Sequence, residues 1–171
     1  ELFKVIAEEK KLSLEMKYKL PQQKFLISTD VVKLRQILTN FLGNAVKYTA
    51  KGSIELGCKL RDHHLLFYVK DQGRGIAPQH QEVIFERFHQ IDDADNTESG
   101  TGLGLAISKG FADLLGGQIG VVSIPNQGST FYLELPYQKV SITNVSRDSK
   151  LSILETANRT LCKKVLIAED E

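Results

Sequence analysis

The chain has 171 residues, of which 42% are hydrophobic and 25% charged, and its formal net charge at pH 7 is +1. This length accommodates one domain of ordinary size and a tail. The small net charge excludes a strong overall field, so neither nucleic acid nor direct membrane contact is expected. Cys58 and Cys162 belong to no Cys-x-x-Cys pair, which disfavours a zinc site and is typical of a reducing, cytoplasmic compartment.

The N-terminal part of the chain predicts the end of a helix and two strands. Residues 2–11 fit the last turns of a helix. Leu12, Leu14 and Met16 alternate with polar residues, as in a strand. Residues 25–28 fit a short second strand.

The strongest helical pattern covers residues 31–48. Asp30 precedes it as an N-cap residue, and Gly52 ends the connection that follows. Apolar side chains recur at helical spacing and predict one buried face. They are Leu34, Ile37, Leu38, Phe41, Leu42 and Ala45.

Two alternating segments, 54–60 and 65–69, predict a β-hairpin with a turn at 62–64, and a glycine-rich turn at 71–76 closes it. Residues 77–99 predict a short helical stretch and then a polar, acidic run.

The glycine-rich run 100–104 is expected to open a helix with apolar positions Leu103, Ile107, Phe111 and Leu114, which Gly116 and Gly117 stop. Strands are predicted at about 118–124 and 130–136. Residues 138–162 are rich in Ser, Thr and Asn and predict a linker with one short helix near 151–154.

Asn40, Asn44, Lys47 and Tyr48 stand at i, i+4, i+7 and i+8 of the long helix and therefore share one face. An amide oxygen suits Mg²⁺, and an ammonium group suits phosphate. The alternative is a polar helix face in water. Two asparagines beside the core of a good helix argue against it, since each lowers helix propensity.

Asp71 has the strand parity of Leu65, Phe67 and Val69, so its carboxylate is expected to point inward. A buried carboxylate needs hydrogen-bond donors, and the exocyclic amino group of adenine is one such donor. The alternative is a turn aspartate that bonds its own backbone amides.

Two glycine-rich loops allow close approach of a ligand. Gly73 and Gly75 tolerate unusual dihedral angles, and the run Gly100–Gly104 precedes a helix whose first amides can face a phosphate. Thr101 adds a hydroxyl donor. The spacing fits neither a P-loop nor a dinucleotide-binding fingerprint.

The long polar segment between the loops predicts a lid or disorder. Phe85 and Phe88 are expected to anchor its base on the core. Arg87 either reaches phosphates or pairs with Glu86 or a lid acid, and the sequence favours neither.

These motifs together resemble those of sensor histidine kinases, within the wider group of gyrase, Hsp90 and MutL ATPases. Residues 34–49 are similar to the N-box, 71–76 to the first glycine box, 85–88 to the F-box, 100–108 to the second glycine box and 128–136 to the closing strands. The five motifs occur in the family's order over about residues 12–136.

The resemblance implies a two-layer α/β sandwich, with a mixed sheet covered by helices on one face, that binds ATP with Mg²⁺. It implies that Asp71 receives the adenine amino group, that Asn44 holds the metal and that residues 76–102 form a lid. The nucleotide-binding candidates are Asn40, Asn44, Lys47, Tyr48, Asp71, Gly73, Gly75, Ile76, Arg87, Gly100, Thr101, Gly102, Leu103, Gly104, Leu105 and Thr130.

The resemblance further implies transfer of the γ-phosphoryl group to a histidine on a dimerisation hairpin before this domain, of which residues 1–11 are the end. No catalytic residue is assigned within the chain. Gyrase-like ATPases resemble this helix with a Glu where Asn40 stands, and an amide cannot accept a proton, so little hydrolysis is expected. The alternatives are an ATP-gated conformational domain of the gyrase or Hsp90 kind and a non-catalytic domain with a degenerate pocket.

Residues 163–171 are similar to the opening strand of response-regulator receiver domains, with Glu169 and Asp170 at the positions of the metal-binding acidic pair. The resemblance implies a hybrid kinase whose catalytic domain covers residues 12–137, with its own or a separate receiver domain as a partner. The alternative is a terminal strand or disordered tail.

Overall fold

The computed structural model describes residues 2–19, 25–91, 101–137 and 164–168. The predicted linker, residues 92–100 of the predicted lid and the acidic end of the chain lie outside these residues. In chain order the elements are α1 (Leu2–Glu9), β1 (Ser13–Lys19), β2 (Phe25–Thr29), α2 (Val31–Tyr48), β3 (Ser53–Arg61), β4 (His64–Asp71), η1 (Pro78–His80), η2 (Val83–Phe85), α3 (Gly104–Leu114), β5 (Gln118–Ile124), β6 (Gly128–Pro136) and β7 (Lys164–Ala168).

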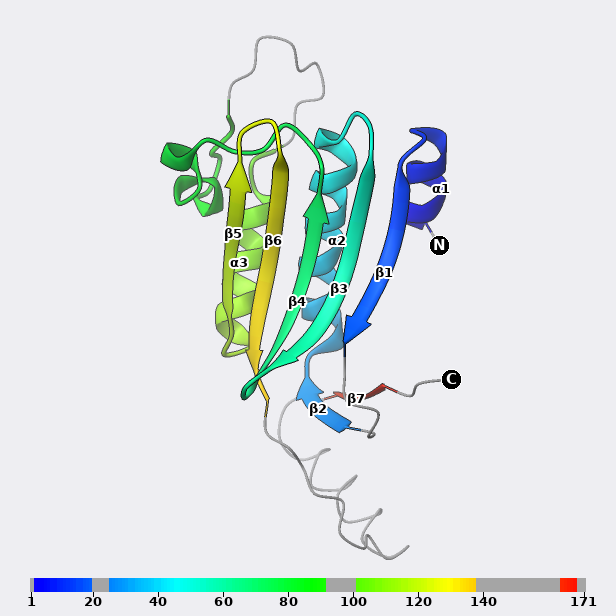
Figure 1. Ribbon diagram of the computed structural model, residues 1–171. Helices are drawn as coiled ribbons and strands as arrows, with labels where there is room; N and C mark the ends of the chain where they lie inside the picture. Colours follow the sequence, from blue (N-terminus) through cyan, green and yellow to red (C-terminus); the bar gives the residue numbers. More distant parts are fainter. Residues whose placement is uncertain (1, 20–24, 92–100, 138–163, 169–171) are drawn as a thin grey trace, which may run out of the picture.

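The main sheet has five strands in the order β1-β3-β4-β6-β5. The β1–β3 pair is parallel and the other pairs are antiparallel. Helices α2 and α3 cover one face of this sheet (Figure 1). The predicted two-layer sandwich with a mixed sheet is therefore confirmed.

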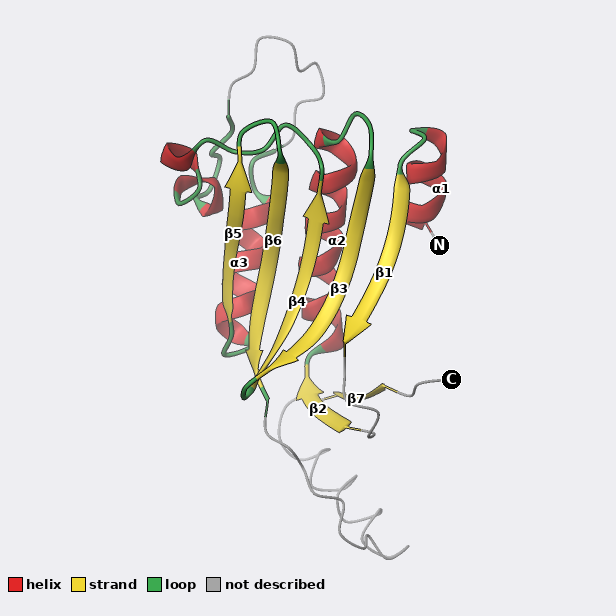
Figure 2. Cartoon of the chain, in the orientation of Figure 1, coloured by secondary structure: helices red, strands yellow, loops and turns green. Residues whose placement is uncertain are grey.

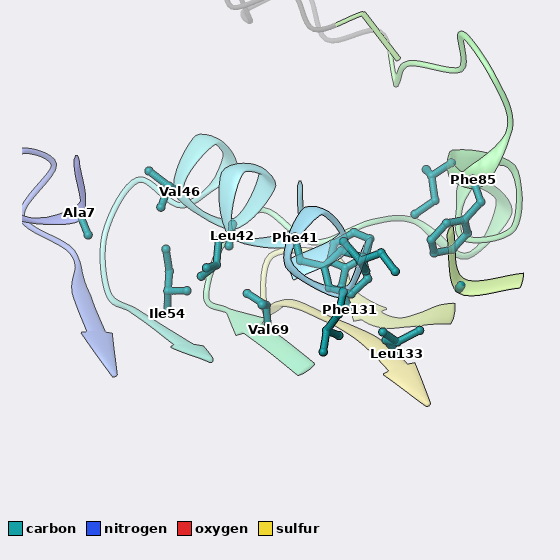
Figure 3. Packing of buried hydrophobic residues seen from close by; sticks show 14 of the residues in the cluster. Ala7, Phe41, Leu42, Val46, Ile54, Val69, Phe85, Phe131 and Leu133 are labelled. Carbon is teal, nitrogen blue, oxygen red and sulfur yellow. The ribbon is translucent and has the colours of Figure 1, made fainter. Parts of the chain in front are cut away.

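Helix α2 begins and ends where the sequence predicts. The Asp30 carboxylate accepts hydrogen bonds from the backbone amides of Val32 (3.0 Å) and Lys33 (3.2 Å), which makes it the N-cap. The apolar face of α2 packs on the sheet, and the rings of Phe41 and Phe131 lie 5.5 Å apart at its centre (Figure 3). This packing fixes the position of the polar face of α2 relative to the last residue of β4 and the first residues of β6.

Two elements differ from the sequence-based expectation. The predicted strand at 25–28 forms, but it lies outside the main sheet and pairs antiparallel with β7. In α3, the buried residues are Ser108 and Ala112, whereas Leu114 is 71% exposed. A polar contact with α2, described below, turns the Ser108 side of α3 inward.

The loops that follow α2 and β4 and the turn between β5 and β6 gather at one edge of the sheet (Figure 2). The short turns η1 and η2 occupy the place of the predicted helical stretch after residue 77. This edge carries most of the motif residues.

Candidate functional site

A cavity of about 580 Å³ opens between α2, the end of β4 and the start of α3. It brings together residues that are far apart in sequence and that the motifs single out. The predicted site residues that line it are Asn40, Asn44, Lys47, Tyr48, Asp71, Gly75, Ile76, Thr101, Gly102, Gly104 and Leu105.

Asp71 is the last residue of β4 and is 5% exposed. Its Oδ1 atom accepts hydrogen bonds from the backbone amides of Gly73 (2.8 Å) and Ser129 (3.2 Å). Among the described residues, no hydrogen bond reaches Oδ2. The bond from Gly73 is the turn geometry considered as the alternative, yet it occupies only one carboxylate oxygen.

Burial raises the pKa of the Asp71 carboxyl above its ordinary value, and the two amide hydrogen bonds offset part of that rise. The carboxylate therefore lacks full compensation within the described protein. A ligand that donates a hydrogen bond to Oδ2 would supply the missing stabilisation.

The two asparagines of α2 have different surroundings although they are one helical turn apart. The Asn40 amide nitrogen donates to the Gly104 carbonyl and to Ser108 Oγ, both at 2.9 Å, and so ties α2 to α3. Asn40 Oδ1 accepts from Gln36 (3.3 Å). For Asn44, no side-chain hydrogen bond occurs within the described parts of the chain, so its amide is available to the cavity.

Tyr48 closes the cavity beside two cations. Lys47 Nζ lies 5.1 Å and the Arg74 guanidinium 4.5 Å from the centroid of the Tyr48 ring. Both distances allow cation–π attraction. Arg74 also lines the cavity, and it was not selected from sequence although it lies within the first glycine box.

The start of α3 presents backbone amides to the cavity. Leu103, the N-cap residue, makes no side-chain capping bond, so the first amides of α3 lack that partner. Gly102 has a φ of 67°, a conformation that disfavours other residues. Gly102 and Gly104 both line the cavity, as an anion site at a helix N-terminus requires.

The first glycine box serves the fold as well as a ligand. An added Cβ at Gly73 would overlap the Tyr48 carbonyl oxygen, and one at Gly75 would overlap the Ile124 carbonyl. Gly75 also has a φ of 68°. Gly73 does not line the cavity, and its nearest neighbour is the chain itself, so its contact with a ligand stays a prediction.

Four further predicted residues fall away from the cavity or outside the described chain. Arg87 is exposed and Leu103 occupies the N-cap position of α3, and neither residue lines the cavity. Gly100 lies outside the described residues. Thr130 does not line the cavity but its neighbour Ser129 does, because side chains alternate along β6 and Ser129 shares the inward face of Phe131.

The remaining lining residues were missed from sequence. Ser129 was detectable from the parity of the buried Phe131 and Leu133. Thr39, Gly43, Arg74 and Phe131 lie inside the motifs but were not selected, whereas the remaining residues lie outside the motifs. Besides Ser129 and Arg74, the missed residues are Phe3, Thr39, Gly43, Ile84, His89, Gln90, Ile91 and Phe131.

The metal-ligating side chains around the cavity suit a metal ion that enters together with a bound phosphate compound. Within the described residues, no group of three or more His, Cys, Asp or Glu side chains could hold a metal ion. Asn44 offers one neutral amide oxygen to the cavity. Mg²⁺ keeps several waters and takes its other ligands from substrate phosphates, so one protein oxygen beside a phosphate site fits this ion.

A helical layer on one face of a mixed sheet, with a cavity at the sheet edge that joins a buried carboxylate to a helix N-terminus, is the arrangement of an ATP-binding α/β sandwich. The chain belongs to the family of histidine kinase-, DNA gyrase B- and HSP90-like ATPases, whose model matches residues 29–139.

Its curated relatives are sensor histidine kinases. The autoinducer 2 sensor kinase/phosphatase LuxQ of Vibrio vulnificus is 41% identical over 145 residues, which cover 81% of this chain and 17% of LuxQ. The sensor histidine kinase AruS of Pseudomonas aeruginosa is 45% identical over 119 residues, which cover 66% of this chain and 12% of AruS. The chain thus spans less than a fifth of the length of either relative.

Solved structures agree with this classification. Full-length ShkA in complex with AMPPNP matches with a TM-score of 0.70 and 36% identity, covering 82% of this chain and 28% of ShkA. The nucleotide-free catalytic domain of the histidine kinase ThkA matches with a TM-score of 0.66 and 26% identity, covering 79% of this chain and 86% of that domain. No helix among the described residues has the length and apolar character needed to cross a membrane.

The contrast between the asparagines gives a paired prediction. Asn40→Ala removes the link between α2 and α3 and should lower the free energy of unfolding by about 1–2 kcal/mol. Asn44→Ala breaks no described hydrogen bond, so it should leave stability nearly unchanged while weakening Mg·ATP binding by about tenfold or more. Urea denaturation and calorimetric titration of both variants check this. Equal losses of unfolding free energy in the two variants would contradict the assignment of a structural role to Asn40 and a ligand-binding role to Asn44.

A second prediction concerns pH. Since the pKa of Asp71 is raised in the folded state, its contribution to stability is full below the unfolded-state pKa and is lost as the pH rises through the folded-state value. The asparagine of the Asp71→Asn variant has no proton to lose in this pH range. Without nucleotide, the free energy of unfolding of the variant minus that of the parent should therefore increase from about pH 3 towards neutral pH. Urea titrations at a series of pH values test this, and a flat or falling difference would refute it.

Proposed function

We propose that this chain binds Mg·ATP and supplies the γ-phosphoryl group to a histidine on a separate dimerisation and phosphotransfer domain. The observation that carries the proposal is Asp71, a buried carboxylate with one oxygen fixed by backbone amides and the other open to the cavity. The adenine amino group is the donor that this oxygen would accept.

The rest of the cavity supports a bound triphosphate. Lys47 contributes a positive charge, and the start of α3 contributes amides without a side-chain cap. Asn44 would hold Mg²⁺ through its amide oxygen, and the metal, when bound, would neutralise phosphate charge. Thr101 borders the same cavity with its hydroxyl group.

Asn40 favours transfer of the phosphoryl group over its hydrolysis. Its amide cannot accept a proton, and both donor contacts of that amide are already used in joining α2 to α3. This argues against the ATP-gated conformational ATPase of the gyrase or Hsp90 kind, the second candidate function. The intact set of Asp71, Asn44 and the α3 glycines argues against a degenerate pocket.

The proposed organisation follows from the motifs. Residues 1–11 would end the upstream hairpin that carries the phosphorylated histidine, residues 12–137 would form the catalytic domain and residues 138–162 a linker. Residues 163–171 would begin a receiver domain, as in a hybrid kinase of the cytoplasm. Within the described part of this segment, β7 pairs with β2.

Two measurements on one pair of proteins test the proposal. Calorimetric titration should detect Mg·ATP binding to the parent chain, and Asp71→Asn should weaken it by more than about tenfold, because the asparagine must present an NH₂ group either to two backbone amides or to the adenine amino group. The chain should also be mixed with radiolabelled ATP and the dimerisation hairpin of the longer protein. It should then place acid-labile phosphate on a histidine of the hairpin. Equal affinity of the two proteins for ATP would contradict the proposal, as would labelling of another residue type.

A further inference from the structure

A second pocket, of about 470 Å³, lies at the C-terminal end of α2. The last residues of α1 and α2 lie at the same edge of the sheet (Figure 1), and the turn of the first glycine box completes the wall. The described residues that line it include three cations and no carboxylate. They are Lys10, Lys47, Tyr48, Thr49, Ala50 and Arg74. A pocket with this balance of charge attracts an anion.

The two lysines of this pocket keep hydrogen-bond donors for a ligand. Lys10 is exposed, and its Nζ donates to the Val46 carbonyl at 3.4 Å. Lys47 Nζ lies over the ring of Tyr48. Neither lysine forms an ion pair within the described parts of the chain. An ammonium group has three donors, and these contacts use at most one of them.

Stabilisation of the C-terminus of α2 is a simpler role for these cations, since positive charge is favourable at that end of a helix. The last carbonyls of α2 already have partners: the Tyr48 carbonyl accepts from the Arg74 amide (3.4 Å), and the Val46 carbonyl accepts from Lys10. These contacts reduce the repulsion that an anion would meet at the helix end. They leave the side chain of Thr49 unexplained.

Thr49 borders the pocket and is 2% exposed. Its Oγ1 atom is buried and has no hydrogen-bond partner within the described residues. A buried hydroxyl group without a partner lowers the free energy of unfolding. An anion whose oxygen accepted from this hydroxyl would remove that cost. The hydroxyl group and the cations therefore point independently to the same kind of ligand.

We propose that this pocket is a second anion site, separate from the nucleotide cavity, in which Thr49 Oγ1 and the surrounding cations hold a phosphate group. Such a group, free or carried by a small molecule, has several acceptor oxygens and enough charge to use a hydroxyl and several cations at once.

The second site would be coupled to the nucleotide cavity, because Lys47, Tyr48 and Arg74 line both. An anion in the second pocket would neutralise cations that a triphosphate also uses. It should therefore weaken nucleotide binding, and nucleotide should weaken binding of the anion by the same factor. This coupling rests on the proposed function, whereas the site itself does not.

Titration of the full chain with inorganic phosphate, followed by phosphorus NMR without nucleotide at constant ionic strength, tests the site. Thr49→Val keeps the shape and removes the hydroxyl group, so it should weaken phosphate binding by about tenfold, the factor of a hydrogen bond to a charged group. Lys10→Gln should weaken it by about twofold to fivefold. Lys109→Gln makes the same change of charge at an exposed position outside both cavities and should leave it unchanged.

Melting temperatures separate a ligand-binding role of Thr49 from a structural one. Without phosphate, Thr49→Val should melt at the same temperature as the parent or higher, because it removes a buried hydroxyl group that has no partner. Added phosphate should raise the melting temperature of the parent and hardly change that of the variant. A variant that melts lower than the parent without phosphate would assign Thr49 a structural role and overturn the inference.

The coupling is measured as the affinity for Mg·ATP with and without phosphate, at constant free Mg²⁺. Saturating phosphate should lower the affinity of the parent by about fivefold and that of Thr49→Val by less. An unchanged affinity overturns the coupling. Equal phosphate binding by the parent, Thr49→Val and Lys10→Gln overturns the site, since phosphate would then bind elsewhere. Should Thr49→Val fail to fold, the exposed Lys10→Gln decides. A parent that binds phosphate but no ATP overturns the proposed function alone.

Discussion

The site depends on one buried carboxylate whose two oxygens have different roles. Backbone amides from Gly73 and Ser129 hold Oδ1 of Asp71, which fixes the orientation of the group at the end of β4. Oδ2 is left towards the cavity, where burial makes an incoming donor valuable. The glycine turn, the start of β6 and the last residue of β4 must all be in place for this arrangement, so the proposed recognition of the base would depend on the main sheet.

Helix α2 links the region of Asp71 to the end of the cavity where the phosphates are proposed to bind. Its apolar face packs against the sheet through Phe41 and Phe131, and its polar face carries the two asparagines. Asn40 holds the start of α3 in position, while Asn44 remains available to the cavity. The start of α3 thus lies beside the cavity because an amide side chain of α2 anchors that helix. Removal of either asparagine should weaken the site for a different physical reason.

Much of this was accessible from sequence because local rules agree with the fold. The Asp30 cap and the periodic stripe determined α2, and alternation determined the β3–β4 hairpin and the inward direction of Asp71. Thr130 was predicted from its motif, whereas strand parity along β6 places its neighbour Ser129 in the cavity lining. Gly73 was assigned to a ligand, although the chain itself occupies the space beside it.

Other features depend on tertiary contacts that no single segment encodes. The interhelical bonds of Asn40 join residues more than sixty positions apart, and periodicity along one helix cannot reveal them. The pairing of β2 with β7 and the proximity of Arg74 to Tyr48 are of the same kind. The contacts of the Ser123 hydroxyl with Ile76 and with the start of β6 likewise join three separate segments, and no pattern within one segment predicts them.

The most direct test is a crystal structure of the chain with Mg²⁺ and a non-hydrolysable ATP analogue. The account predicts the adenine amino nitrogen within about 3 Å of Asp71 Oδ2, with Oδ1 still bonded to the amides of Gly73 and Ser129. A base whose amino group faces solvent, or a nucleotide bound outside this cavity, would contradict it.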